Sequence, residues 1–356
     1  VKTAVEQYQY GDFSKWRFLS NPAEKSRTEN KFARDVKEAL KQVRPTKKSP
    51  RSAAAKTDAQ ATFHRPSVSP PQSRVKTYFV GQERDDDTFT SISSALDAAE
   101  QGSRIVVASG VYREKINLNK NLEIIGEGDP GSVVVEMKTG VALAVTAQFG
   151  LVRNISFSIF GTAPRKGDRC FSCMACKVFE GRMTFEDCVF SSKGCAALGI
   201  EGSSSSPVFH RCRFENSFES GVSVITGATP EFYDCQIRDN RNVGTQVKSK
   251  SKALFRSCAF SGNRFDGAFI LEGSEARFED CEFYRNGEAG ISVKSDGNAI
   301  VHRCGLSDNV EAGFQTEDRS GKGEVIDSNF KENGLGAFKL VGFIKSNVYR
   351  RGNTEE

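Results

Sequence analysis

The sequence has few histidines and no long apolar run. Its 356 residues include 3 His, 1 Trp and 3 Met. No stretch approaches the roughly 18 apolar residues of a membrane-spanning helix, so we expect no membrane span. The chain begins at Val1 without a charged-then-apolar leader. We therefore expect a fragment or a processed form, in which a signal peptide is either missing or removed.

An internal repeat dominates the second half of the chain. Six cysteines follow one another at intervals of 24, 23, 23, 23 and 23 residues, and Ser328 continues the series. An apolar residue, most often Phe, stands three positions before each cysteine and another two positions after it. Such a fixed period predicts a repeat architecture. The cysteines are Cys188, Cys212, Cys235, Cys258, Cys281 and Cys304.

Two further residue types keep the same period. Glycines at 221, 244, 267, 290, 313 and 336 each open a stretch with apolar residues at every second position, which is typical of a strand with one face buried. Asparagines at 240, 263, 286, 309 and 333 come five residues after the cysteines, or at the equivalent place. Asn tolerates the left-handed backbone of a turn, and stacked amides can bond as a ladder. Each unit of about 23 residues is too small to bury its apolar face alone, so the units must stack as a solenoid of coils.

The entry to the repeats completes a resemblance to a known family. Ile92, Ala95, Leu96 and Ala99 have helical spacing, and Gly102 would stop the helix. A helix followed by short strands resembles the right-handed parallel β-helix proteins of the pectin-lyase-like class, over roughly residues 77–350. The resemblance implies an all-β fold of about 9–10 coils, whose open N-terminal end is plugged by a capping helix.

The charge distribution separates the amino-terminal part from the repeats. Residues 1–76 hold 17 Lys/Arg against 7 Asp/Glu, a net charge of +10, which leaves −5 for the remainder. We predict a basic, partly helical segment at 1–43, a disordered Pro/Ser/Lys-rich linker at 44–76, the β-helix at 77–350 and a tail at 351–356. The basic segment is a flexible linker or an electrostatic contact for nucleic acid, an acidic protein surface or a membrane surface.

The ten cysteines allow disulfides or a metal site as alternatives to core packing. In the ladder they occupy equivalent inward positions, which favours buried thiols as core filler. Unpaired thiols favour a reducing compartment, so we expect a cytoplasmic or nuclear protein. Cys170, Cys173 and Cys176 have spacing that would suit a metal or iron–sulfur site on a loop, but on a strand Cys173 points away from the other two. We predict neither metal nor cofactor, and the role of these three stays open.

The charged positions beside the cysteines argue against catalysis. Acidic and basic residues alternate there, so the basic side chains would pair with the carboxylates of adjacent coils and neutralise them. His210 and His302, four coils apart at about 4.8 Å per coil, are too distant to share an ion. A lone catalytic Asp234 or Asp280 is the remaining alternative. The two columns are Asp187, Arg211, Asp234, Ser257, Asp280, Arg303 and Asp327, and Glu186, His210, Tyr233, Arg256, Glu279 and His302.

An exposed column follows the glycines and offers a possible contact surface. It runs Ser223, Gln246, Phe269, Ser292, Gln315 and Phe338. With Phe218 and Phe265 at nearby turns, its Phe269 could contact a sugar ring or a peptide. We assign no binding residue from the sequence.

The resemblance implies two alternative functions. Enzymes of the class carry clustered calcium-binding carboxylates, paired Asp with Arg, or Gly-His-Gly, Arg-Ile-Lys and Asn-Thr-Asp motifs, and the three tripeptides are absent here. The chain looks more like the non-enzymatic β-helix domains of F-box proteins and of Shc SH2-domain-binding proteins, although it has no F-box in residues 1–76. We predict a non-enzymatic module with a protein partner. The alternative is a carbohydrate-active or carbohydrate-binding protein, of the polysaccharide lyase or hydrolase type.

Overall fold

The computed structural model describes residues 75–81, 88–161, 173–341 and 347–355. These residues belong to the second of two compact units, which begins at Pro71. Both predicted amino-terminal segments therefore lie almost wholly outside the described residues, and so does Cys170.

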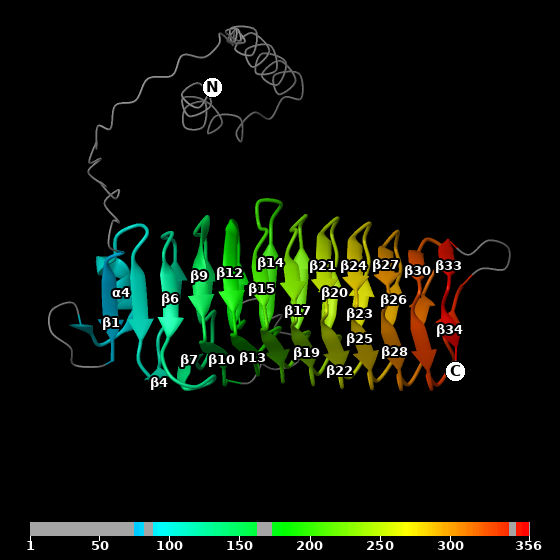
Figure 1. The fold of residues 1–356 in the computed structure, drawn as a ribbon, viewed down its shortest axis with the longest axis horizontal. Coiled ribbons are helices and arrows are strands. Elements are labelled where there is room, and N and C mark those ends of the chain that lie inside the picture. The colour runs from blue at the N-terminus through cyan, green and yellow to red at the C-terminus, as the bar shows by residue number, and fades with distance from the viewer. Residues whose placement is uncertain (1–74, 82–87, 162–172, 342–346, 356) are drawn as a thin grey trace, which may run out of the picture. The chain divides into compact units, whose positions relative to one another are not determined.

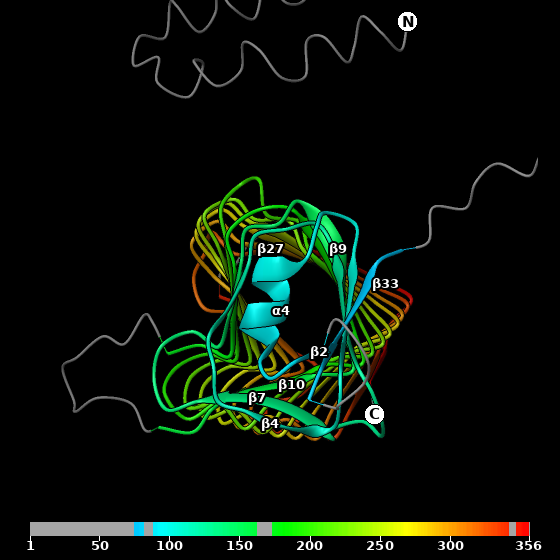
Figure 2. The same ribbon diagram turned by 90° about the vertical axis from the view of Figure 1, so that its left-hand side faces the viewer.

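Three parallel sheets wind around a common interior, so that the chain forms a parallel β-helix (Figures 1 and 2). Sheet A contains β1 (Thr77–Val80), β2 (Thr88–Phe89), β3 (Arg104–Val107), β6 (Glu123–Gly126), β9 (Phe149–Arg153), β12 (Arg182–Glu186), β15 (Val208–His210), β18 (Glu231–Tyr233), β21 (Lys252–Arg256), β24 (Glu275–Glu279), β27 (Asn298–His302), β30 (Lys322–Ile326) and β33 (Val348–Arg351).

Sheets B and C complete each coil. Sheet B contains β4 (Gly110–Tyr112), β7 (Val133–Met137), β10 (Ser156–Ile159), β13 (Val189–Ser192), β16 (Arg213–Glu215), β19 (Gln236–Arg238), β22 (Ala259–Ser261), β25 (Glu282–Tyr284), β28 (Gly305–Ser307), β31 (Asn329–Lys331) and β34 (Thr354–Glu355). Sheet C contains β5 (Ile116–Leu118), β8 (Leu143–Val145), β11 (Cys176–Val178), β14 (Leu198–Glu201), β17 (Val222–Ile225), β20 (Thr245–Val247), β23 (Ala268–Ile270), β26 (Ile291–Val293), β29 (Phe314–Thr316) and β32 (Phe338–Lys339).

The solenoid is longer than the sequence predicted. Sheet B has 11 strands, which corresponds to about eleven coils rather than nine or ten. The predicted boundary at residue 350 lies inside β33, and Asn329 and Phe330 of β31 pair with Thr354 and Glu355 of β34. Residues 351–355 therefore continue the last described coil, and the separate tail predicted at 351–356 was wrong for them.

A single left-handed residue makes the corner between sheets A and B. Asp187, for example, has φ 54° between β12 and β13. Left-handed backbone in a non-glycine residue is unfavourable by about 1–2 kcal/mol, so the strand ladders on both sides must hold it. The same corner is left-handed at Asp187, Arg211, Asp234, Ser257, Asp280, Arg303 and Asp327.

The interior consists of stacked aromatic rings and thiols. Phe255 lies with its ring centroid 4.6 Å from that of Phe232 and 5.2 Å from that of Phe278, in successive coils. The six ladder cysteines are buried and free of disulfides. Burial raises the pKa of the Cys212 and Cys258 thiols well above the usual range. The prediction of thiols as core filler is confirmed.

A ladder of asparagine amides supports the turn between sheets B and C. Nδ2 of Asn263 donates to Oδ1 of Asn286 at 3.0 Å and to the carbonyl of Ile237 at 3.2 Å. The predicted ladder is thus confirmed, but the left-handed residue is the one before each Asn, as at Arg285 with φ 55°. The Asn side chains supply the hydrogen bonds of the ladder, and the residue before each Asn adopts the left-handed backbone of the turn.

Helix α4 (Ile92–Ala98) lies across the N-terminal end of the coils, as Figure 2 shows. Its apolar face buries Ile92, Ala95 and Leu96, and the Ser91 side chain caps its first turn. The capping helix was predicted, but its stop at Gly102 was not correct. The helix ends at Ala98, and Ala99 already has an extended backbone. The described part of the chain contains no helix with the length and apolar character of a membrane span.

Candidate binding site

The outward face of sheet A carries the charged column that the sequence predicted. Glu186 pairs in register with His210, His210 with Tyr233 and Tyr233 with Arg256. The column continues through Glu279 to His302. Neighbouring side chains therefore stand one coil apart, about 4.8 Å.

Most carboxylates on this face are neutralised by arginine. Glu279 accepts from Arg256 at 2.6 Å and also from Arg277, and these hydrogen bonds lower the pKa of its carboxyl. Arg153 pairs with Glu186 at 2.7 Å in the same way. The predicted alternation of acid and base is confirmed here, and a carboxylate held ionised by guanidinium groups cannot serve as a general acid near neutral pH.

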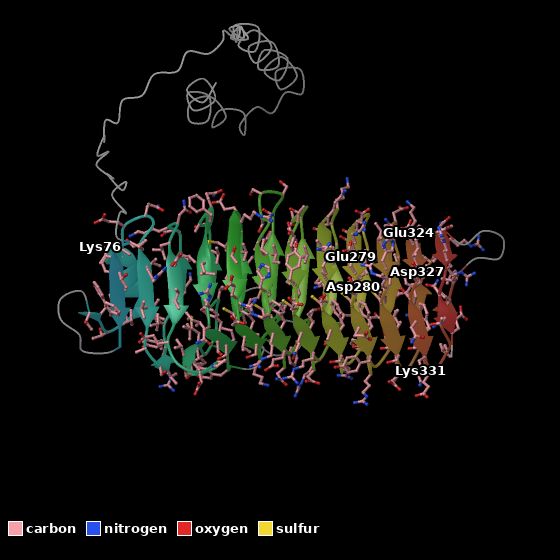
Figure 3. All side chains as sticks on the ribbon, viewed as in Figure 1. Lys76, Glu279, Asp280, Glu324, Asp327 and Lys331 are labelled. Carbon is pink, nitrogen blue, oxygen red and sulfur yellow. The ribbon has the colours of Figure 1, made fainter. Side chains whose placement is uncertain are left out.

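The corner column is paired only in part. Arg211 makes a two-pronged contact with Asp187, at 2.8 and 3.0 Å, and Arg303 makes one with Asp280, at 2.7 and 2.9 Å. Arg303 lowers the pKa of Asp280, which does not suit the role of proton donor that the sequence left open. Asp234 and Asp327 form no ion pair with any other described residue. Figure 3 shows Asp280 and Asp327 at equivalent corners of different coils.

A hollow of about 390 Å³ interrupts the face of sheet A at its last three strands. Six outward residues form its lining in two neighbouring columns, above the backbone of Gly323. Figure 3 places Glu324 toward this end of the solenoid. The columns are Asn298, Lys322 and Asn347, and Ile300, Glu324 and Tyr349, from β27, β30 and the segment that ends in β33.

The polar groups of the hollow are positioned by their own neighbours. Glu324 Oε1 lies 2.7 Å from His302 Nε2, and Asn347 Nδ2 donates to the carbonyl of Arg319 at 2.9 Å. Glu324 Oε2 and Asn347 Oδ1 make no hydrogen bond to another described residue. Tyr349 is 56% exposed. The lining thus combines an exposed aromatic ring with hydrogen-bond acceptors that are held in place and remain available.

The column on sheet C differs from its prediction. Ser223, Ser292 and Gln315 are 8%, 0% and 5% exposed, so this column is largely covered and not a free surface. Phe338 pairs with Phe314 and belongs to the inward column, and the outward position is Lys339. The change from period 23 to 24 near the last coils accounts for this slip of one residue.

The turn before β23 of sheet C holds a buried acid that the sequence analysis missed. Asp266 is 2% exposed and accepts hydrogen bonds from the Ser292 hydroxyl and from the Ala289 amide. Burial raises its pKa to about 7, and Glu288 adds to the shift. The equivalent positions of the neighbouring coils are Val243 and Ala289. The sequence did contain a signal for this site, because an Asp stands where the neighbouring coils have apolar residues.

No metal centre is found among the described residues. No three or more His, Cys, Asp or Glu side chains there are grouped so that they could hold an ion. Cys173 and Cys176 are buried without disulfides, and Cys176 points into the core at the start of β11. Cys170 lies outside the described residues, so the role of the three cysteines stays open.

The structure therefore defines a parallel β-helix with an ion-paired strand face and a polar-aromatic hollow at one end. The family model described as "Right handed beta helix region" matches residues 151–252 and 220–354, which is more than half of the sequence. The chain belongs to this right-handed β-helix family. No curated protein sequence matches it.

Solved structures share the fold at low sequence identity. Tailspike protein 2 of the Escherichia coli O157:H7 bacteriophage CAB120 has a TM-score of 0.57 and 12% identity, over 73% of this chain and 43% of the tailspike. The A-module of the Azotobacter vinelandii mannuronan C-5 epimerase AlgE4 has 0.51 and 13%, over 74% and 90%. The pectin methylesterase PemA of Erwinia chrysanthemi has 0.50 and 11%, over 78% and 92%. This likeness shows the pectin-lyase-like fold. The predicted closeness to the F-box and Shc-binding proteins stays a prediction.

Proposed function

We propose that this protein is a carbohydrate-binding β-helix and that the saccharide binds in the hollow on sheet A. The proposal rests on the residues that line the hollow. Sugar rings present apolar faces that stack on aromatic side chains and hydroxyls that need fixed hydrogen-bond partners. Tyr349 supplies an exposed ring, and Asn298, Asn347 and Glu324 supply amide and carboxylate groups.

The family setting supports the same choice. The neighbours described above include proteins named for mannuronan and pectin, which are polysaccharides. Their names apply to those proteins, and the hollow is the feature of this chain that would make a saccharide its ligand as well. The alternative function inferred from the sequence is thereby favoured over the protein-binding module.

The residues of this lining support binding of a saccharide without its cleavage. Glycoside hydrolysis commonly uses two carboxyl groups that flank the scissile bond. Glu324 is the single carboxylate among the lining residues, and it is already in contact with His302. The remaining acids of sheet A are largely tied to arginine.

Calorimetric titration with short oligogalacturonates, oligomannuronates and neutral cello-oligosaccharides tests the proposal. We expect one of these classes to bind, and Tyr349→Ala to weaken that binding about tenfold, since aromatic stacking contributes about 0.5–1.5 kcal/mol beyond the area it buries. Phe149→Ala is the matched control, because Phe149 is 63% exposed on β9 of the same sheet. Equal effects of the two variants, or no binding of any saccharide, would refute the proposal.

A further inference from the structure

Unpaired arginines gather at one corner of the solenoid. Between residues 182 and 303, seven arginines form ion pairs with carboxylates, at Arg182, Arg211, Arg213, Arg238, Arg256, Arg277 and Arg303. The other three, Arg241, Arg264 and Arg285, pair with no described carboxylate. All three are exposed, and they come from three successive coils at the turn between sheets B and C. We call these three residues the arginine corner.

The backbone register places two of the three arginines at equivalent positions of adjacent coils. Arg241 and Arg264 occupy equivalent positions of adjacent coils, because their amides bond to the carbonyls of Ser217 and Asn240, which are also equivalent. Arg285 stands in the next coil, two residues before Gly287. The arginine corner therefore spans two coil spacings, about 10 Å.

Aromatic rings and glycines shape this surface. The Arg241 guanidinium lies 6.0 Å from the centroid of the Phe218 ring, and that of Arg264 lies 5.5 Å from Phe265. A stacked guanidinium keeps its N–H groups free for carboxylate or phosphate oxygens, and stacking limits its freedom before binding. Gly262 and Gly287 occupy the positions equivalent to Arg285 and Arg264 in the neighbouring coils, so neither adds a side chain to this surface.

We propose that the arginine corner binds a short acidic segment of a partner protein. Guanidinium groups make two-pronged, charge-assisted hydrogen bonds with carboxylates, which is how arginine clusters select acidic motifs. The corner is too short for a long polyanion, because Glu219, Asp239 and Asp308 stand at or beside its ends. Three guanidinium groups match a short acidic segment, whereas the affinity of nucleic acid depends on many phosphate contacts.

The experiment measures fluorescence anisotropy of a labelled peptide, Ser-Glu-Asp-Glu-Asp-Glu-Ser, with the full chain at low salt. Arg241→Glu with Arg264→Glu reverses two charges of the corner, and Arg285→Ala removes the third. Lys248→Glu with Lys250→Glu is the matched control. It makes the same charge change at two lysines that form no ion pair with a described residue, on the turn between sheets C and A.

We expect the wild-type chain to bind the peptide, the double arginine variant to bind at least tenfold more weakly, and the lysine variant to remain within about twofold of the wild type. Arg241→Gln with Arg264→Gln repeats the test if the charge reversal prevents folding. Equal losses in the arginine and lysine variants, or no binding by the wild type, would contradict the proposal. Tighter binding of oligothymidylate or of an oligogalacturonate at the same corner would show that the partner class is wrong.

Discussion

The Ser292 hydroxyl donates a hydrogen bond to the buried carboxylate of Asp266, one coil away on sheet C. Ser292 in turn accepts from the Gln315 amide at 2.8 Å. The three side chains connect successive coils on the outside of the sheet, and all of them are covered. Glu288 and Glu317 act on Asp266 in the direction that disfavours its charge, so this chain of hydrogen bonds depends on pH.

Asp266→Asn should remove a pH dependence of stability. The folded carboxyl has a pKa of about 7, above the roughly 3.9 of an unfolded Asp. The folded state therefore holds an extra proton between these values, and stability falls as pH rises from about 4 to 7 and levels off above. At pH 8 the variant should be more stable than the wild type, by an amount on the order of 1–4 kcal/mol.

Urea denaturation at several pH values measures the effect of Asp266→Asn. Asp308→Asn, at an exposed position, is the control and should leave the pH profile unchanged. A wild-type profile that is flat between pH 4 and 8, or one that Asp266→Asn leaves as steep as before, would refute the assignment.

Asn263→Ala should destabilise the asparagine ladder. The substitution leaves the buried carbonyl of Ile237 without the amide donor that it has now, and it removes the acceptor of Asn240 Nδ2. An unsatisfied buried polar group is unfavourable by about 1–3 kcal/mol, so we expect a loss of at least that size in the free energy of unfolding. Asn117→Ala, at an exposed position of β5 without a left-handed backbone, should change it by less than about 0.5 kcal/mol. Similar losses in both variants would mean that the ladder is not a stabilising element.

The thiols of the cysteine ladder should be unreactive in the folded protein. All six are buried, which keeps the reagent away from them, and burial raises the pKa of Cys212 and Cys258, so the reactive thiolate is scarce at these two. Titration with an aromatic disulfide reagent at neutral pH should label these six positions only after denaturation, when all of them should react. Fewer reactive thiols in the denatured protein would indicate disulfides and would weaken the prediction of a reducing compartment, which stays untested.

Lys120→Met should loosen the capping helix. The Lys120 ammonium donates to the carbonyls of Leu96, Asp97 and Ala99 at 2.8–2.9 Å. The last carbonyls of a helix have no N–H donor within the helix, so Lys120 satisfies acceptors that the helix itself leaves unpaired. Met keeps the aliphatic stem and removes the donor, so we expect a loss of about 1–3 kcal/mol in unfolding free energy. Lys115→Met, at an exposed position of the same coil, is the control. Equal effects of both changes on the denaturation midpoint would mean that the contacts of Lys120 with α4 do not stabilise the fold.

Periodicity predicted the fold because each coil repeats the same residue types at the same spacing. An inward Phe and Cys at fixed spacing and an amide ladder recur often enough to be predicted without coordinates, whereas the left-handed corner before each cysteine was not predicted. Register failed where the period changes by one residue, and so Phe338 was placed outward instead of Lys339. The helix stop at Gly102 failed because the backbone is already extended at Ala99, whose carbonyl accepts a hydrogen bond from Lys120.

The candidate site could be predicted much less well. Tyr349, Glu324 and Asn347 come from two strands and a turn, and nothing in their spacing marks them as neighbours. Asp266 was visible in the sequence, but its burial depends on residues of other coils. Likewise, the alternation of Asp and Arg predicted ion pairs in general, whereas only the coordinates distinguish the paired Asp280 from the unpaired Asp234.

The amino-acid sequence by itself determined that this protein is a β-helix with a thiol and amide interior, because a unit of about 23 residues buries its apolar face only by stacking. The tertiary structure decided which surface groups remain available. Whether an arginine meets a carboxylate or stays free, and whether an outward residue is covered or lines a hollow, depends on side chains of adjacent coils. Those contacts depend on the exact strand register and on the side-chain rotamers, and neither can be predicted from the period of the sequence.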